Sequence, residues 1–194
     1  RVAVKVLDIQ ANPDDLIVLH QRFLREAKTA AQLEHANVVQ ILDYGLAKHS
    51  GTEKPFLVME LLDGHDLEHE LLSNGTLAPE RASKLFAGAL DALAASHDMG
   101  IVHRDLKPSN LYLVHPGQED ERLVVVDFGI ARAFEDKDAK LTSTSHFTGT
   151  PAYLAPEYIS EQKVSPALDV YQMGLIITES LTGKPVVQAS APLG

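Results

Sequence analysis

The chain has 194 residues, a formal net charge of −10 and no cysteine. The absence of cysteine excludes disulfides and cysteine-ligated zinc sites. The negative charge argues against nucleic acid or an anionic membrane as the main partner, so a phosphate site would need local cations or a divalent metal. Hydrophobic residues make up 45% of the chain, enough for one domain or two small lobes. No apolar run approaches the ~20 residues of a membrane-spanning helix.

The first third of the chain is predicted to contain three strands and one helix. Residues 1–7 alternate and are rich in β-branched side chains, which favours a strand. A helix is predicted to begin at the motif NPDD, residues 12–15. Residues 38–45 and 55–62 are predicted to be strands joined by a polar loop over 47–54. One apolar stripe follows the helix in steps of three and four residues, at Leu16, Leu19, Phe23, Ala27 and Ala30.

The middle of the chain is predicted to begin with a turn and a short helix over 62–72. A long amphipathic helix should run from Pro79 to about His97. A loop at 103–110 should lead into a strand, whose partner is the apolar stretch 123–129 across a polar loop.

The last part should contain an exposed Ser/Thr-rich loop over 131–149 and an apolar helix over 165–183. Strands dominate early in the chain and helices dominate later. This order predicts an α+β fold, with a small β-rich lobe followed by a helical lobe, rather than an alternating βαβ sheet.

The stretch HRDLKPSN, residues 103–110, concentrates polar chemistry in one predicted loop. Asp105 can accept a proton or a hydrogen bond, Lys107 carries a positive charge, and Asn110 offers an amide oxygen. An anionic substrate that loses a proton beside a bound metal would need all three groups. A polar surface turn around Pro108 is the alternative interpretation.

Lys5 lies within an otherwise apolar strand, so its ammonium must reach solvent or pair with an acid. Glu26 borders the inward stripe of the predicted helix, and a pair with Lys5 would hold the ammonium ready for phosphate oxygens. The alternatives are a lysine with its end in solvent and an exposed Glu26–Arg22 pair, worth only ~0.3–0.5 kcal/mol.

The motif DFG places Asp127 at the end of an apolar strand, where a carboxylate needs a cation or hydrogen-bond donors. Magnesium prefers one or two carboxylates together with phosphate oxygens and water. Asn110 and Asp127 would supply such oxygens from neighbouring strands of one hairpin. By itself DFG is more often a turn, and GTPAYLAPE at 149–157 is by itself a turn-rich connector.

In combination, VAVK, the helical Glu26, HRDLKPSN, DFG and APE follow the order of the protein-kinase signature set. From Val2 to about Gly183 the chain resembles the eukaryotic-like, Hanks-type serine/threonine protein kinases of the branch also found in bacteria. The resemblance implies a bilobal protein-kinase domain over 1–194. Residues 1–62 would form the N-lobe part and 63–194 the C-lobe part. The implied activity is transfer of the ATP γ-phosphate to Ser/Thr hydroxyls of protein substrates.

The resemblance also implies catalytic roles. Asp105 would accept the proton of the substrate hydroxyl, and Lys107 would steady the γ-phosphate. Asn110 and Asp127 would hold Mg²⁺. Lys5 would contact the α- and β-phosphates, with Glu26 as its partner.

By the same resemblance, a nucleotide would lie between the two lobes. Met59 matches the gatekeeper position, and Glu60 and Leu62 match the hinge residues whose backbone contacts adenine. Asp66 matches a residue that contacts ribose. Ala3 and Tyr112 would enclose the purine, with Tyr112 bulkier than the usual aliphatic residue.

Several further positions concern the loop around Asp105. Thr150 resembles the threonine that contacts the catalytic loop, and Asp169 resembles the buried helical aspartate that braces its backbone. Arg104 would pair with a phosphate on the activation loop, with Thr142 and Thr144 as autophosphorylation sites. A solvated Ser/Thr loop is the alternative. Autophosphorylation between two molecules would need a homodimer.

The chain also departs from the family pattern. No glycine-rich loop precedes Lys5, since the first glycine is Gly45, and the resemblance stops near the family's helix F. We therefore expect an incomplete kinase domain that is weakly active by itself and cytoplasmic, or the cytoplasmic domain of a membrane-anchored kinase. Gln172 stands where a small residue, often serine, is common. A non-catalytic kinase-like scaffold is the alternative function.

Overall fold

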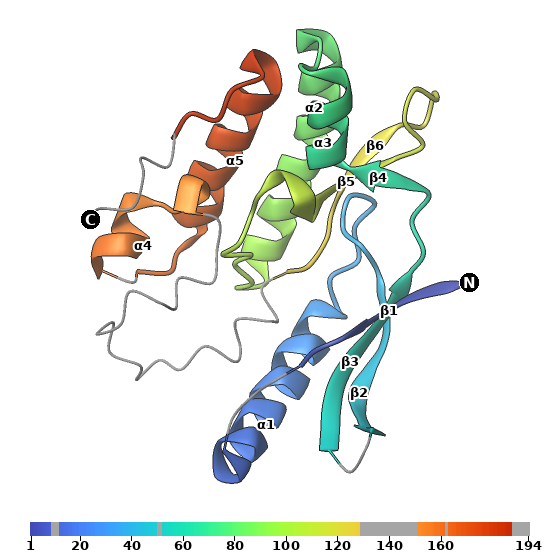
Figure 1. Cartoon of the computed structure of the whole chain (residues 1–194), viewed down its shortest axis with the longest axis vertical. Coiled ribbons are helices and arrows are strands. Elements are labelled where there is room, and N and C mark those ends of the chain that lie inside the picture. Colours follow the sequence, from blue (N-terminus) through green and yellow to red (C-terminus); the bar gives the residue numbers. More distant parts are fainter. Residues whose placement is uncertain (9–11, 50–51, 129–150, 162, 188–194) are drawn as a thin grey trace.

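The computed structural model describes residues 1–8, 12–49, 52–128, 151–161 and 163–187. Figure 1 shows two parts: a sheet accompanied by a long helix, and a helical part that carries a second small sheet. This arrangement confirms the predicted α+β fold, with the β-rich part first in the chain.

The larger sheet contains β1 (Val2–Val6), β2 (Ile41–His49) and β3 (Thr52–Glu60) in the order β1-β3-β2, with both pairs antiparallel. The β2–β3 ladder extends to the pair His49–Thr52. The prediction of a loop over 47–54 is therefore wrong for residues 47–49 and 52–54. The loop was predicted because these side chains are polar, but pairing of the backbone does not require apolar side chains. Lys48 also lies opposite Glu53, so the two side chains have complementary charge.

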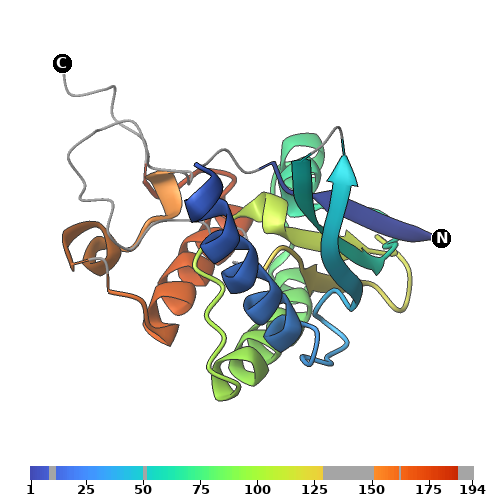
Figure 2. The same ribbon diagram turned by 90° about the horizontal axis from the view of Figure 1, so that it is seen from below.

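Helix α1 (Pro13–Ala30) packs against this sheet, as both views show (Figures 1 and 2). The predicted stripe supplies the contact, because Phe23, Ala27 and Ala30 are buried with Leu57 of β3. Burial of this face fixes the orientation of the helix relative to β1 and its Lys5.

The small sheet contains β4 (Gly64–Asp66), β5 (Leu111–Val114) and β6 (Arg122–Val125) in that order. The β5–β6 hairpin confirms the predicted pairing of the two stretches around the polar loop. β4 lies where only a turn was expected, since a strand of three residues gives no periodic signal. Gly64 allows it: its φ is 151°, and an added Cβ would lie 2.0 Å from the carbonyl oxygen of Leu113.

The helical part contains α2 (Leu67–Asn74), α3 (Pro79–Asp98), α4 (Pro156–Glu161) and α5 (Pro166–Thr182). The main core joins α3 to α5, with Phe86 and Leu93 on one side and Met173 and Ile176 on the other. Gly183 ends α5 in the left-handed conformation, with a φ of 71°, as its place after the apolar run predicts.

Backbone contacts join the two parts. The N–H of Val39 donates to the carbonyl of Val125 at 3.0 Å, and the N–H of Val125 donates to the carbonyl of Asn37 at 2.8 Å. The segment before β2 is thereby fixed to β6, which ends two residues before Asp127. The predicted loop over 131–149 lies outside the described residues. No helix in the described ranges has the length and apolar character needed to cross a membrane.

Candidate active site

Helix α5 holds the loop 103–110 in place through Asp169. Asp169 is completely buried, and its two oxygens accept hydrogen bonds from the backbone N–H groups of His103 and Arg104, each at 2.8 Å. Arg104 has a φ of 69°, a left-handed conformation that a non-glycine residue adopts only when its surroundings enforce it. The predicted bracing of the loop backbone by Asp169 is confirmed.

His103 connects this loop to the strand before Asp127. Its Nε2 lies 2.9 Å from the carbonyl oxygen of Val126, and its Nδ1 lies 3.3 Å from the backbone nitrogen of Asp105. Burial lowers the pKa of His103, so the imidazole is neutral near pH 7. The neutral ring therefore donates to Val126 through Nε2 and accepts from Asp105 through Nδ1.

Asp105, Lys107 and Asn110 lie together in this loop. Lys107 Nζ is 3.3 Å from a carboxylate oxygen of Asp105, and both side chains are partly exposed. Asn110 Nδ2 donates to the backbone carbonyl of Asp105 at 2.6 Å. The carboxylate of Asp105 is thus partly accessible to solvent and has a cation beside it.

The second half of the site is the pair formed by Lys5 and Asp127, whose Nζ and Oδ1 atoms are 2.8 Å apart. Asp127 also has a left-handed φ of 60°. A cavity of about 30 Å³, too small for a nucleotide, lies beside this pair and is lined in part by Met59 and Phe128. The pair between Lys5 and Glu26 stays a prediction.

The two halves are adjacent. The N–H of Val126, the residue before Asp127, donates to the carbonyl of Asn110 at 3.0 Å. The structure therefore places the polar residues of the loop 103–110 next to the Lys5–Asp127 pair. In the described part of the chain, no three His, Cys, Asp or Glu side chains form a group that could hold a metal ion. A metal bound here would need oxygens from its substrate in addition to Asn110 and Asp127.

The positions predicted to bind a nucleotide lie next to this site. Met59, Leu62 and Tyr112 border one hydrophobic cluster around Val39 and Val114. Neighbouring strands place Ala3 opposite Met59 and Val2 opposite Glu60.

The residues predicted to surround the ribose and the purine have protein partners of their own. Asp66 accepts a hydrogen bond from the N–H of His69 at 2.7 Å and so caps α2. Tyr112 donates to the carbonyl of Gly64 at 2.7 Å, and burial, with the charges of Asp66 and Asp63, raises its pKa. Thr142, Thr144 and Thr150 lie outside the described residues.

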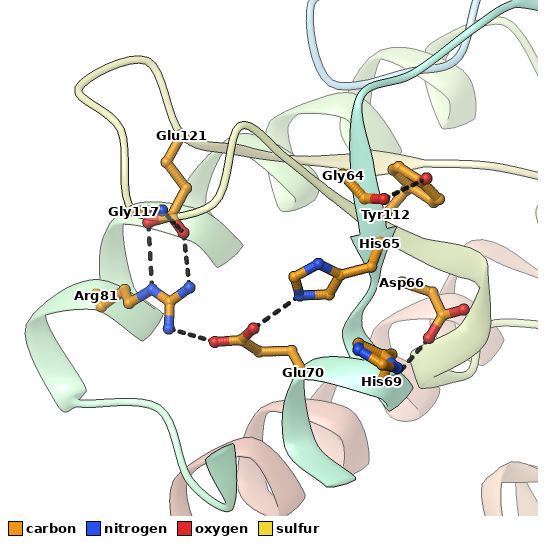
Figure 3. A network of polar contacts seen from close by, with 9 residues as sticks. All are labelled: Gly64, His65, Asp66, His69, Glu70, Arg81, Tyr112, Gly117 and Glu121. Carbon is orange, nitrogen blue, oxygen red and sulfur yellow. Dashed lines mark hydrogen bonds and ion pairs between the residues drawn. The ribbon is translucent and has the colours of Figure 1, made fainter. Parts of the chain in front are cut away.

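An ion-pair network beside α2 was not predicted from the sequence (Figure 3). Arg81 of α3 contacts Glu70 at 2.6 Å and Glu121 through two nitrogens, at 2.6 and 3.2 Å. His65 lies 2.8 Å from the other oxygen of Glu70. These partners are 5, 11 and 40 residues apart, so no local spacing announces the network.

Burial raises the pKa of Glu70, but the hydrogen bonds from His65 and Arg81 outweigh it and leave the pKa below its ordinary value. The hydrogen bond from Arg81 likewise lowers the pKa of Glu121, and its two acidic partners raise the pKa of Arg81. The network fixes the polar loop between β5 and β6 to the helical part.

The contacts of two polar residues with Asp169 or with the loop 103–110 were also not predicted. His97 Nε2 lies 2.7 Å from Asp169, and the side-chain amide of Gln172 contacts the backbone on both sides of Asp105. The sequence contained one indication for Gln172: its side chain is large at a position where the family commonly has a small residue.

Comparison with known proteins shows the family of the chain. The family model described as the protein kinase domain matches residues 1–192. The serine/threonine-protein kinase PkaA of Streptomyces coelicolor is 44% identical over 95% of this chain, and PknB of Mycolicibacterium smegmatis is 39% identical over 99%. The chain spans 32% and 30% of the lengths of these two relatives.

Solved structures share the fold. The kinase domain of PknI from Mycobacterium tuberculosis, in a mutant form, matches with a TM-score of 0.72 and 25% identity, covering 100% of this chain and 68% of that one. Rad53 in complex with AMP-PNP matches with a TM-score of 0.74 and 27% identity, covering 98% of this chain and 43% of that one. The matching family model and these relatives show that the chain belongs to the protein kinase family, and the geometry of the site is consistent with this.

Proposed function

We propose that this chain is the catalytic part of an ATP-dependent protein serine/threonine kinase. One observation carries the proposal: the Lys5–Asp127 pair lies beside the cluster of Asp105, Lys107 and Asn110. Phosphoryl transfer needs groups that orient a hydroxyl and neutralise phosphate charge, and this site offers both. The names of the relatives PkaA and PknB support the same activity.

In this proposal Asp105 orients the substrate hydroxyl and accepts its proton, since its carboxylate is accessible and is held by a fixed loop. Lys107, 3.3 Å from that carboxylate, lies where it can neutralise charge on the transferred phosphate. Lys5 contacts the remaining phosphates, with Glu26 as its second partner. Thr150 contacts the catalytic loop.

Asn110 and Asp127 would hold Mg²⁺. Because Asn110 donates through Nδ2 to the carbonyl of Asp105, its amide oxygen is the atom left for a cation. Asp127 pairs with Lys5 through one oxygen and has a second. An amide and a carboxylate suit a magnesium ion that is also bound by phosphate oxygens, which neutralises charge on the phosphates.

The adenine would lie against the hydrophobic cluster beside Met59. Rad53, which shares the fold, was solved in complex with AMP-PNP, and this supports a nucleotide as the ligand of this domain. The residues proposed to surround the base and the ribose are Ala3, Met59, Glu60, Leu62, Asp66 and Tyr112.

Regulation by phosphorylation is also proposed, with Thr142 and Thr144 modified between two copies of the chain. Arg104 Nε is buried and has no hydrogen-bond partner among the described residues, as expected of a cation that awaits an anion. We further propose that residues 1–62 and 63–194 are the N-lobe and C-lobe parts, and that the domain acts in the cytoplasm.

The test is transfer of labelled γ-phosphate from ATP to a protein substrate by the full-length protein, followed by phosphoamino-acid analysis. Wild type should label serine or threonine only when Mg²⁺ is present. An Asp105→Asn variant should bind ATP normally and transfer ~10²–10⁴-fold more slowly. Equal labelling by both proteins would contradict the role of Asp105. Nucleotide binding without any transfer would favour the kinase-like scaffold.

A further inference from the structure

We infer that Gln172 is a positioning residue for Asp105, an inference that rests on the proposed kinase function. Gln172 lies on α5, three residues after Asp169, so both side chains project from the same face of the helix. It is 1% exposed, although glutamine is among the residue types that are mostly found at the surface.

The amide group of Gln172 contacts both peptide groups that flank Asp105. Its Oε1 accepts a hydrogen bond from the N–H of Leu106 at 3.1 Å, and its Nε2 lies 3.4 Å from the carbonyl oxygen of Arg104. The first contact has ordinary hydrogen-bond length, whereas the second is long, so the Leu106 contact carries the larger share.

Asp169 and Gln172 together hold a continuous run of backbone. Asp169 binds the N–H groups of His103 and Arg104, and Gln172 binds the carbonyl of Arg104 and the N–H of Leu106. The backbone N–H of Asp105 itself contacts His103 Nδ1. The peptide groups before and after Asp105 are therefore fixed, and with them the direction in which its carboxylate projects.

The length of the side chain matters for this role. Gln172 bridges two peptide groups because its amide carries a donor and an acceptor at the end of a flexible stem. A serine at this position has one hydroxyl on a much shorter stem and cannot take both partners directly. Leu106 is itself fully buried, so its N–H depends on this side chain rather than on bulk water.

The experiment compares Gln172→Met with the neighbouring control Met173→Leu in the full-length protein. Gln172→Met keeps the length and removes both polar contacts. Met173→Leu alters a buried side chain of the same helix that belongs to the apolar core. Gln172→Met should lower kcat about 10- to 100-fold with ATP affinity unchanged. Met173→Leu should retain kcat.

Hydrogen exchange of the Leu106 amide supplies a readout that does not need activity. Gln172→Met should accelerate this exchange at unchanged melting temperature, and Met173→Leu should not. Unchanged kcat and unchanged Leu106 exchange in Gln172→Met would overturn the inference. An inactive wild type would instead contradict the proposed function, and the exchange data would still decide whether Gln172 fixes the backbone around Asp105.

Discussion

The ammonium of Lys5 lies 2.8 Å from the carboxylate of Asp127, and this contact joins β1 to the segment that follows β6. Each side chain is 34% exposed. An ion pair this accessible is worth only about 0–1 kcal/mol of stability, because water and salt screen it. The pair therefore contributes little to holding the two parts of the domain together, and its proposed role is to orient charge in the site.

Replacing Lys5 should consequently separate activity from stability. Lys5→Met should lower kcat/KM for phosphoryl transfer about 10²- to 10³-fold, since a positive group aimed at phosphate charge is removed. Denaturant unfolding should show a loss of no more than about 1 kcal/mol. Lys5→Arg is the matched control, which keeps the charge and should fold equally well. Transfer by Lys5→Met at the wild-type rate would exclude the role given to Lys5.

In contrast to Lys5, the network around Arg81 should contribute substantially to stability. Glu70 and Glu121 have side chains that are only 4% and 10% exposed, so removing Arg81 leaves two buried carboxylates without their cation. We expect Arg81→Met to lower the free energy of unfolding by about 2–3 kcal/mol, less than a fully buried pair because the guanidinium is partly exposed. Lys84→Met, beside the same loop, is the control and should cost under about 0.5 kcal/mol.

This loss of stability should depend on pH. The folded-state pKa values of Glu70 and Glu121 lie below the ordinary value of 4.5, so the folded protein binds fewer protons than the unfolded chain. Their contribution is complete above pH 4.5 and disappears as the pH falls through the folded-state values. The difference in unfolding free energy between wild type and Arg81→Met should therefore be constant above pH 4.5 and shrink as the pH falls below it. A difference that also stays constant below pH 4.5 would contradict these assignments.

Two glycines with positive φ should differ sharply when changed to alanine. In Gly64→Ala the new Cβ would lie 2.0 Å from the Leu113 carbonyl oxygen, so β4 must move and the variant should lose about 3–5 kcal/mol. At Gly75, with a φ of 81°, an added Cβ meets nothing within 4 Å. Gly75→Ala should cost only the backbone strain of a side chain at this positive φ, about 1–3 kcal/mol. Thermal unfolding measures both, and equal losses would refute the close contact at β4.

The sequence was informative where chemistry or periodicity repeats over short distances. Apolar steps gave α1, α3 and α5, alternation gave β1, and ordered motifs gave Asp105 and Asp127. Short-range patterns could not reveal β4, whose three residues form a strand only because Gly64 permits close approach to β5. They also could not reveal the contacts of Gln172 or Arg81. Gln172 joins α5 to the loop 103–110, and Arg81 joins α3 to α2 and to the loop between β5 and β6, and only tertiary packing brings these segments together.

Asn110 and Asp127 are proposed to complete a nucleotide site that needs magnesium, and this is the central claim to test. ATP binding by the full-length protein should be measured calorimetrically with Mg²⁺ and with a chelator, for wild type, for Asp127→Asn and for Asp98→Asn at the exposed end of α3. We predict that Mg²⁺ strengthens ATP binding in wild type and in Asp98→Asn, and that Asp127→Asn loses this gain while keeping metal-free binding. The same Mg²⁺-dependent gain in Asp127→Asn, or none in wild type, would contradict the account.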